Sequence, residues 1–159
     1  MGTHGLTLRL LPLEEAQLMV AGRPTPAMQA AWHPEYPLAD TLEGLTWLLA
    51  AHQALGGPYP ESPWWSYQLV VDGQAVGDIG FHGPLDEHQQ VSIGYQVVPS
   101  ARRRGLATAA CAQIIQLAWS AGARRLLAST DVDNVASQRV LRRNGFRTDD
   151  GRTFAIDRP

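Results

Sequence analysis

The sequence predicts a mixed α/β (α+β) fold in which helices flank a central, mainly antiparallel sheet. Two observations lead to this prediction: short apolar segments joined by turn dipeptides in the middle of the chain, and longer helical patterns on either side of them. The chain has 159 residues, of which 45% are hydrophobic and 18% are charged. This length and composition are typical of one folded domain, residues 1–159, with a core of its own.

The N-terminal part of the chain begins with a strand and continues with helices. Leu6–Leu13 alternates as a strand does, and Glu14–Gly22 follows as a short helix that ends at glycine. Residues 23–40 are rich in proline and are expected to form a loop with helical pieces. Asp40–Gly57 has leucines at helical spacing, with Asp40 or Thr41 as its cap and a Gly-Gly pair at its end.

The central part of the chain predicts an antiparallel meander. Trp64–Gly83 contains two apolar runs around Asp72-Gly73, a dipeptide that favours a hairpin turn. Val91–Pro99 then reads as a third strand that ends at a proline.

The C-terminal part of the chain alternates helices and strands. Thr108–Gly122 is an amphipathic helix, Arg124–Thr130 is a strand, Asn134–Phe146 is a helix, and Phe146–Asp157 is a last hairpin. The strand at 91–99, the helix after it and the strand at 124–130 make a strand–helix–strand unit. Such a unit predicts a right-handed crossover.

The net charge is only −2, but it is unevenly distributed. All thirteen cationic residues are arginines. Residues 1–100 hold two arginines and ten acidic residues, whereas residues 101–159 hold eleven arginines and five acidic residues. A positive C-terminal half suits a polyphosphate ligand, and an acidic N-terminal half suits a cationic one; attraction between the two halves across one surface is the alternative explanation.

Several classes of protein are disfavoured by the sequence. No apolar run approaches the roughly 20 residues that span a membrane, and no signal-peptide pattern is found, so we expect a cytoplasmic protein without a membrane partner. The single cysteine, Cys111, excludes an internal disulfide and is expected to be inert core. The five histidines lack ligand spacing, so we predict no metal. The overall charge and the absence of a sustained basic stripe predict no nucleic-acid partner.

One short stretch, RRRGLA at Arg102–Ala107, has the features of an anion-binding loop. It connects a predicted strand to a predicted helix, whose first N–H groups and dipole favour an anion. Gly105 lets the backbone approach a ligand, and Ala107 and Thr108 leave the N–H groups uncovered. The chain has no lysine for a Walker loop and no G-x-G-x-x-G string for a dinucleotide fold. A pyrophosphate site of another kind is the interpretation that fits.

With this R-x-x-G-x-A loop, the sequence resembles the GNAT superfamily of acyl-CoA-dependent N-acetyltransferases, whose pyrophosphate loop reads Q/R-x-x-G-x-G/A. Ser129–Phe146 (STDVDNVASQRVLRRNGF) is similar to the second signature of that family, N-x-x-S followed by a helix that ends in N/L-G-F. The resemblance covers residues 64–147 by motif and residues 6–60 by topology. It implies a GNAT-like mixed, mainly antiparallel sheet flanked by helices.

A finer similarity is to the branch that contains the ribosomal-protein N-terminal acetyltransferases. That branch typically has G-x-I-G-F and x-I-G-Y strands, as in Gly77–Gly83 (GDIGFHG) and Ser92–Tyr95 (SIGY). The resemblance implies direct transfer of an acetyl group from acetyl-CoA to a primary amine, either of a protein N-terminus or of a small molecule. The resemblance is compatible with a homodimer, because dimers are common in this superfamily.

The resemblance also implies roles for individual residues. The residues implied to bind acetyl-CoA are Val97, Val98, Arg102, Arg103, Arg104, Gly105, Leu106, Ala107, Thr108 and Asn134. A backbone N–H near Val97 would polarise the thioester carbonyl, and Asn134 would hold the pantetheine arm. Ser137 would donate a proton to the departing thiolate, directly or through water, because the tyrosine of many members is Leu141 here.

The general base is left open by the sequence. Many members carry a glutamate ten residues before the loop, where this chain has Ser92, which cannot act as a base unaided. Asp78 and His82 are expected on one face of the neighbouring strand, and either could accept the proton through water. An amine that enters already neutral is the alternative. A chain that kept the loop and lost the base would instead be a non-catalytic acyl-CoA-binding module.

Overall fold

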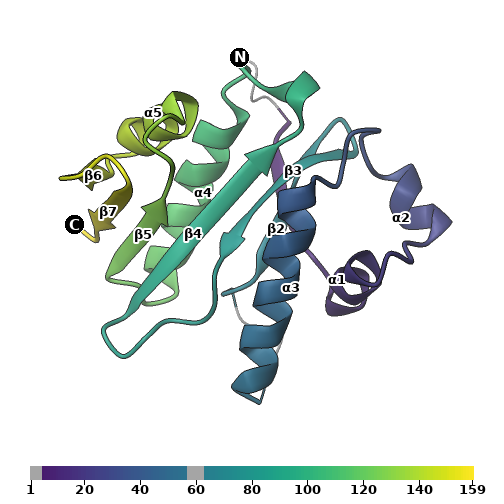
Figure 1. The fold of residues 1–159 in the computed structure, drawn as a ribbon, viewed down its shortest axis with the longest axis horizontal. Helices are drawn as coiled ribbons and strands as arrows, with labels where there is room; N and C mark the ends of the chain where they lie inside the picture. The colour runs from purple at the N-terminus through teal and green to yellow at the C-terminus, as the bar shows by residue number, and fades with distance from the viewer. Residues whose placement is uncertain (1–4, 57–62) are drawn as a thin grey trace.

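A computed structural model describes residues 5–56 and 63–159, which form one seven-stranded sheet with helices on both of its faces (Figure 1). The strands are β1 (Thr7–Leu10), β2 (Ser66–Val71), β3 (Gln74–Phe81), β4 (Gln90–Val97), β5 (Arg125–Ser129), β6 (Arg147–Thr148) and β7 (Thr153–Asp157). The helices are α1 (Leu13–Val20), α2 (Pro26–Ala30), α3 (Ala39–Ala54), α4 (Leu106–Ser120) and α5 (Val135–Arg143), with a 3-10 turn η1 (Pro99–Ala101). The strand order is β1-β2-β3-β4-β5-β7-β6.

The predicted mixed, mainly antiparallel sheet is confirmed. Every strand pair is antiparallel except β4–β5, which is joined through α4 as the strand–helix–strand pattern predicts. Asp72 and Gly73 both have positive φ angles, 51° and 77°, which is the turn conformation that a two-residue hairpin requires. In Figure 1, α3 lies in front of the sheet and α4 lies behind it.

The β4–β5 pairing is short. It joins Gln90–Ser92 to Arg125–Leu127 and then stops, although β4 continues to Val97. No strand of the described chain pairs with this edge of β4 beyond Ser92, and the two strands diverge. One edge of the C-terminal half of β4 is therefore open.

The backbone groups on the open edge follow from the pairing on the other edge. His82 N donates to Ser92 O (2.9 Å), and Val98 N donates to Val76 O (2.8 Å). Antiparallel strands exchange such bonds at every second residue, so the even-numbered residues of β4 bond to β3. The N–H and C=O groups of Tyr95 and Val97 therefore point away from β3, toward the open edge.

Two helix starts differ from the sequence-based expectation. α4 begins at Leu106 rather than Thr108, because Gly105 takes a left-handed conformation (φ 74°) directly before it. α3 begins at Ala39, and neither Asp40 nor Thr41 is its N-cap; Leu38 holds that position. The Thr41 hydroxyl instead reaches back and accepts a hydrogen bond from Leu38 N (3.2 Å). Gly57, the second glycine of the expected stop, lies outside the described residues.

The core is one cluster on both faces of the sheet, and Cys111 is fully buried in it as predicted. Burial raises the pKa of its thiol to about 12, so the thiol stays protonated. Among residues 5–56 and 63–159, no helix combines the length and the apolar character needed to cross a membrane. In the same residues, no three potential metal-ligating side chains gather into a group.

The close approach of β2 to β3 predicts an asymmetric response to the same substitution at two glycines. A Cβ at Gly80 would lie 2.8 Å from both Ser66 Cα and Trp65 O, whereas a Cβ at Gly44 on α3 meets nothing within 4 Å. Gly80→Ala is expected to lower the free energy of unfolding by about 2 kcal/mol or more. Gly44→Ala is expected to raise it by up to about 1 kcal/mol. Urea unfolding of both variants measures this difference, and equal midpoints would contradict it.

Candidate functional site

A cavity of about 660 Å³ follows the open edge of β4 and lies between this strand, α4 and α5. Nine of the residues singled out from the sequence line it: Val97, Arg102, Arg103, Gly105, Leu106, Ala107, Thr108, Asn134 and Ser137. Further lining residues that the sequence analysis did not assign include Asp40, Tyr95, Gln96, Arg139 and Arg143. The two sequence motifs, far apart in the chain, therefore meet at one cavity.

The end of this cavity at α4 is an anion cradle, made of Gly105, Leu106, Ala107 and Thr108. Gly105 precedes the first turn of the helix, which contains no acidic residue, so its N–H groups and dipole favour an anion. Arg103 also has a positive φ (64°), and Arg102 Nε donates to Val97 O (2.9 Å). This last bond ties the loop to the open edge of β4.

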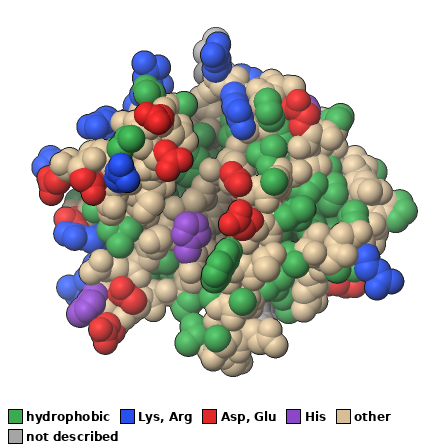
Figure 2. Space-filling model, in the orientation of Figure 1, with side chains coloured by type: hydrophobic (Ala, Val, Ile, Leu, Met, Phe, Trp, Pro, Cys, Tyr) green, Lys and Arg blue, Asp and Glu red, His purple; other side chains and the backbone are tan. Residues whose placement is uncertain are grey.

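Positive charge surrounds the cavity. Arg102, Arg103, Arg139 and Arg143 all line it. Figure 2 shows arginine side chains at the top of the molecule and, with acidic side chains among them, along its left, where Figure 1 places the segment between β4 and α4 (top) and α5 and β7 (left). The uneven charge of the sequence thus becomes a positive region beside the cradle, as expected for a site that binds a polyphosphate.

Val98 and Arg104 are not among the residues that line the cavity. Val98 is fully buried, and its N–H is already paired with Val76 O within the sheet. Arg104 is exposed, on the outside of the loop. Only the odd-numbered residues of β4 present their backbone groups to the cavity. Val98 follows β4 at an even-numbered position, so its N–H points toward β3.

Across the cavity, Tyr95 of β4 contacts Ser137 of α5. The Tyr95 hydroxyl donates to Ser137 O (3.1 Å) and lies 2.9 Å from Ser137 Oγ. A tyrosine hydroxyl has one proton, and the carbonyl accepts it, so the Ser137 hydroxyl donates to Tyr95. Burial raises the pKa of Tyr95 to about 12, so the Tyr95 hydroxyl keeps its proton at neutral pH.

Asn134 has a structural contact that its sequence position did not predict. Its side-chain Oδ1 accepts a hydrogen bond from Ser137 N (3.1 Å), so Asn134 is the N-cap of α5. The cap fixes the first turn of α5, which carries Ser137. The amide NH2 of Asn134 is left to face the cavity that the residue lines.

Asp78 lies on the α3 side of the sheet and is only 7% exposed. Thr41 Oγ1 donates to its Oδ2 (2.6 Å), and Gln96 Nε2 donates to its Oδ1. The pKa of Asp78 is raised to about 7, mainly by burial and to a smaller extent by the nearby Asp40, against the opposing effect of the two hydrogen bonds. Asp78 does not line the cavity, but its partner Gln96 does.

His82, the residue directly after β3, lies on the same face of the sheet as Asp78, as expected, but four residues further along the chain, about 13 Å away. Its imidazole covers Gly94 of β4, where a Cβ would lie 2.6 Å from Nε2. Its side chain is exposed in part, and the burial of the remainder lowers its pKa. The imidazole is therefore neutral at neutral pH and can accept a proton.

The structure also aligns four polar residues that the sequence analysis did not connect. Arg9 pairs with Gln68, Gln68 with Asp78, and Asp78 with Gln96, so the four form one row across β1, β2, β3 and β4. We call this set the polar row. Each member interrupts a strand that is otherwise mostly apolar, which is a signal in the sequence, but their alignment depends on strand register.

Comparison with known proteins gives a consistent result. The family described as acetyltransferase (GNAT) domain matches residues 5–147. The chain is 28% identical over 111 residues to the uncharacterized N-acetyltransferase YoaA of Bacillus subtilis (strain 168), covering 68% of this chain and 63% of that protein. It is 35% identical over 74 residues to the uncharacterized N-acetyltransferase YjdG of the same organism, covering 46% and 44%. The matches thus span less than two thirds of the length of these curated relatives.

Solved structures share the fold. The ribosomal L7/L12 alpha-N-protein acetyltransferase RimL in complex with coenzyme A has a TM-score of 0.65 and 18% identity, covering 99% of this chain and 96% of that one. Mycobacterium smegmatis RimJ in complex with CoA-disulfide has a TM-score of 0.63 and 23% identity, covering 96% and 81%. The microcin C7 self-immunity acetyltransferase MccE, in complex with acetyl-CoA and AMP, has a TM-score of 0.62 and 16% identity, covering 99% and 94%.

The burial of Asp78 predicts how stability depends on pH. Its folded-state pKa of about 7 is above the value of about 3.9 for an unfolded chain. Between these pH values Asp78 holds a proton in the folded chain that it has lost in the unfolded chain. The contribution of Asp78 to the free energy of unfolding therefore falls as pH rises from about 4 to about 7. Asp78→Asn is expected to remove this part of the pH dependence.

Urea unfolding at pH 5 and pH 7.5 measures the effect. The matched control is Asp72→Asn, which changes an exposed aspartate in the β2–β3 turn and should leave the pH dependence of the native chain intact. The prediction is wrong if the Asp78→Asn and native curves stay parallel over this range.

Proposed function

The chain belongs to the GNAT acetyltransferase family, and we propose that it transfers an acetyl group from acetyl-CoA directly to a primary amine. One observation carries the proposal: the anion cradle at the start of α4 and the open edge of β4 face a single cavity. In this proposal residues 1–159 act as one domain in the cytoplasm, as a monomer or a homodimer, without a metal, a nucleic acid or a membrane.

The cavity fits the chemistry of acetyl-CoA. The N–H groups that follow Gly105 suit the pyrophosphate, and the arginines around them suit its negative charge. The amide groups of a pantetheine arm match the backbone N–H and C=O groups on the open edge of β4, and Asn134 adds an amide NH2. A volume of about 660 Å³ is within the ordinary range of small-molecule sites.

The acetyl group would lie near Val97 and Ser137. The amine nitrogen attacks the thioester carbon, the C–S bond breaks, and the amine loses one proton. The Val97 N–H faces the open edge, where it can polarise the thioester oxygen as negative charge develops. The Ser137 hydroxyl turns from Tyr95 to the thiolate, donates its proton to the sulfur and regains a proton from solvent. Tyr95 is a positioning residue, because its bonds to Ser137 O and Oγ orient the serine.

We assign His82 as the acceptor of the amine proton, through a chain of water molecules, because His82 does not line the cavity itself and its contact at Gly94 is three residues, about 10 Å, from Val97. His82 is neutral at neutral pH, reaches solvent, and covers the backbone of β4 at Gly94 on the face opposite α4. Asp78 is less suited to direct contact, because both of its oxygens are bonded and it is buried under α3. In this assignment Asp78 orients Gln96, which lines the cavity.

The acceptor would approach from the α3 side of the sheet. Asp40 lines the cavity there, and the N-terminal half of the chain is acidic, which suits an amine that is cationic in bulk solution. The name of RimL describes an enzyme that acts on a protein N-terminus, and this supports a protein N-terminus as one acceptor. A small primary amine is the other.

Calorimetric titration with acetyl-CoA tests the cradle. Gly105→Glu places a side chain and a negative charge where the anion would bind, at a left-handed backbone position. It is expected to weaken binding by about 100-fold, equivalent to about 2.7 kcal/mol. The matched control is Gly151→Glu, the same substitution at a left-handed glycine of the β6–β7 turn, with open space around it. The control should bind as the native chain does.

Turnover is then measured as thiol release with a panel of N-terminal peptides and small amines. Absence of acetyl-CoA binding by the native chain would contradict the proposed function. Binding without thiol release for any amine would favour the non-catalytic acyl-CoA-binding module, for which the serine at position 92 is the supporting observation.

The assignment of His82 predicts a specific kinetic change. His82→Gln is expected to lower kcat by about 100-fold, the ordinary contribution of a general base, and to leave acetyl-CoA binding unchanged. The pKa of His82 is below its ordinary value of 6.5, and kcat of the native enzyme should rise as pH increases through it. The variant should not show this rise of kcat with pH. His88→Gln, an exposed histidine between β3 and β4, is the control. An unchanged kcat in His82→Gln would refute the assignment.

A further inference from the structure

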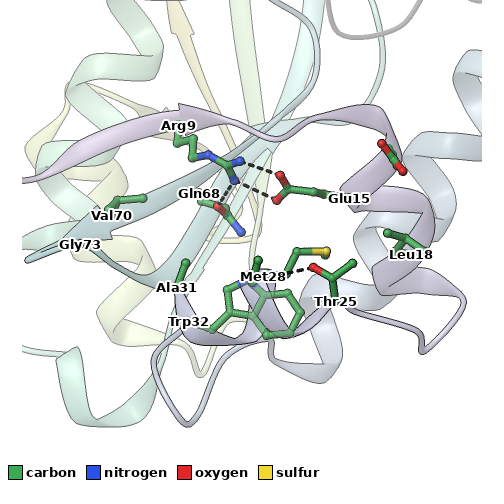
Figure 3. A pocket seen from close by; sticks show the side chains of 12 residues that line it. Arg9, Glu15, Leu18, Thr25, Met28, Ala31, Trp32, Gln68, Val70 and Gly73 are labelled. Atoms are coloured by element: carbon green, nitrogen blue, oxygen red, sulfur yellow. Dashed lines mark hydrogen bonds and ion pairs between the residues drawn. The ribbon is translucent and has the colours of Figure 1, made fainter.

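A second cavity, of about 450 Å³, lies between α1, α2 and the strands β1 and β2 (Figure 3). It shares no lining residue with the cavity along β4. β2 and β4 are separated by β3, so the two sites are about 10 Å apart across the sheet. Asp78 is buried between them. The second cavity is therefore not the place where an acetyl group would be transferred.

The floor of the second cavity contains an unpaired hydrogen-bond donor. Gln68 is only 3% exposed; its Oε1 accepts from Arg9 Nη1 (2.8 Å), but its Nε2 makes no hydrogen bond of ordinary geometry among the described residues. The buried Tyr36 hydroxyl, which also makes none, is its polar neighbour. Figure 3 shows this amide above Trp32 and Met28, inside the cavity. A buried donor without a partner costs about 1–3 kcal/mol. A ligand oxygen placed here would recover that energy.

Charged groups of both signs stand beside this donor. Arg9 donates to Glu15 through two bonds of 2.7 and 3.0 Å, and to Gln68 through a third. A guanidinium has five N–H groups, so two are left for a ligand. Glu14, one residue before Glu15, also lines the cavity and adds a second carboxylate. The polar end therefore offers donors for an anionic group and carboxylates for a cationic group.

The opposite end of the second cavity is apolar. Leu18 of α1, Met28 of α2 and Trp32 line it, and the Trp32 ring is held edge-on by Tyr36 at a centroid distance of 5.7 Å. A flexible methionine beside a fixed aromatic ring suits an aliphatic or aromatic side chain.

We propose that the second cavity binds a free α-amino acid with an apolar side chain. The carboxylate accepts from Gln68 Nε2 and from the remaining N–H groups of Arg9. The ammonium group faces Glu14 and Glu15, and the side chain packs among Leu18, Met28 and Trp32. A compound without the carboxylate leaves Gln68 Nε2 unbonded, and a compound without the ammonium group loses its attraction to Glu14 and Glu15. The proposal does not depend on the transferase activity.

Titration of the full chain, saturated with CoA, tests the proposal by isothermal calorimetry with L-leucine, 4-methylpentanoate and L-leucinamide. The second compound lacks the ammonium group and the third lacks the carboxylate. L-Leucine is expected to bind saturably, and each analogue is expected to bind at least about 10-fold more weakly. The proposal is overturned if neither L-leucine nor L-phenylalanine binds, or if either analogue binds as tightly as L-leucine.

Two variants locate the site. Gln68→Glu keeps the acceptor for Arg9 and removes the donor, and the matched surface control is Gln53→Glu on α3. Ala27→Trp fills the second cavity from an exposed position on α2 and leaves the polar groups in place. Both cavity variants are expected to weaken L-leucine binding at least about 10-fold, with unchanged CoA binding as the check of folding. L-Leucine binding that is unchanged in Ala27→Trp would overturn the proposal.

Discussion

The early end of the β4–β5 pairing, after Ser92 and Leu127, is the constraint on which the first cavity depends. A continued ladder would have used the N–H and C=O groups of Tyr95 and Val97 within the sheet. Because the strands diverge, these groups face a cavity, where buried backbone groups require another partner. The neighbouring contacts keep the gap in place: Tyr95 joins Ser137 across it, and Arg102 binds the carbonyl of Val97 at its end.

Two independent features converge on this open edge. The helix N-terminus at Gly105 supplies fixed N–H groups, and the arginines of the loop and of α5 supply charge. On the other face of the same strands, Gly94 makes room for the His82 imidazole. β4 thus separates an anion-binding side from a side that carries the His82 imidazole, and the proposed transfer uses both sides.

The polar row crosses the same sheet, and its two central members, Gln68 and Asp78, are buried, which costs free energy unless they are hydrogen-bonded. Its members are tolerated because they bond to one another or to neighbouring helices: Arg9 to Glu15 and Gln68, and Asp78 to Thr41 and Gln96. Thr41 gives its proton to Asp78 and accepts from Leu38, so the start of α3 and the burial of Asp78 depend on each other. The unpaired Nε2 of Gln68 is the exception, and it faces the second cavity.

The sequence by itself determined the elements, their order and the anion loop, because these follow from local patterns: Asp72-Gly73 for a turn, Gly105 before a helix, and short apolar runs for β2, β3 and β4. It could not predict that Val98 lies outside the cavity and that Tyr95 lies inside it, because strand register and the direction of backbone groups depend on the partner strand. It did not reveal the contact between Tyr95 and Ser137, the burial that raises the pKa of Asp78, or the second cavity. Only the tertiary structure decided these, because each depends on side chains brought together from segments far apart in the chain.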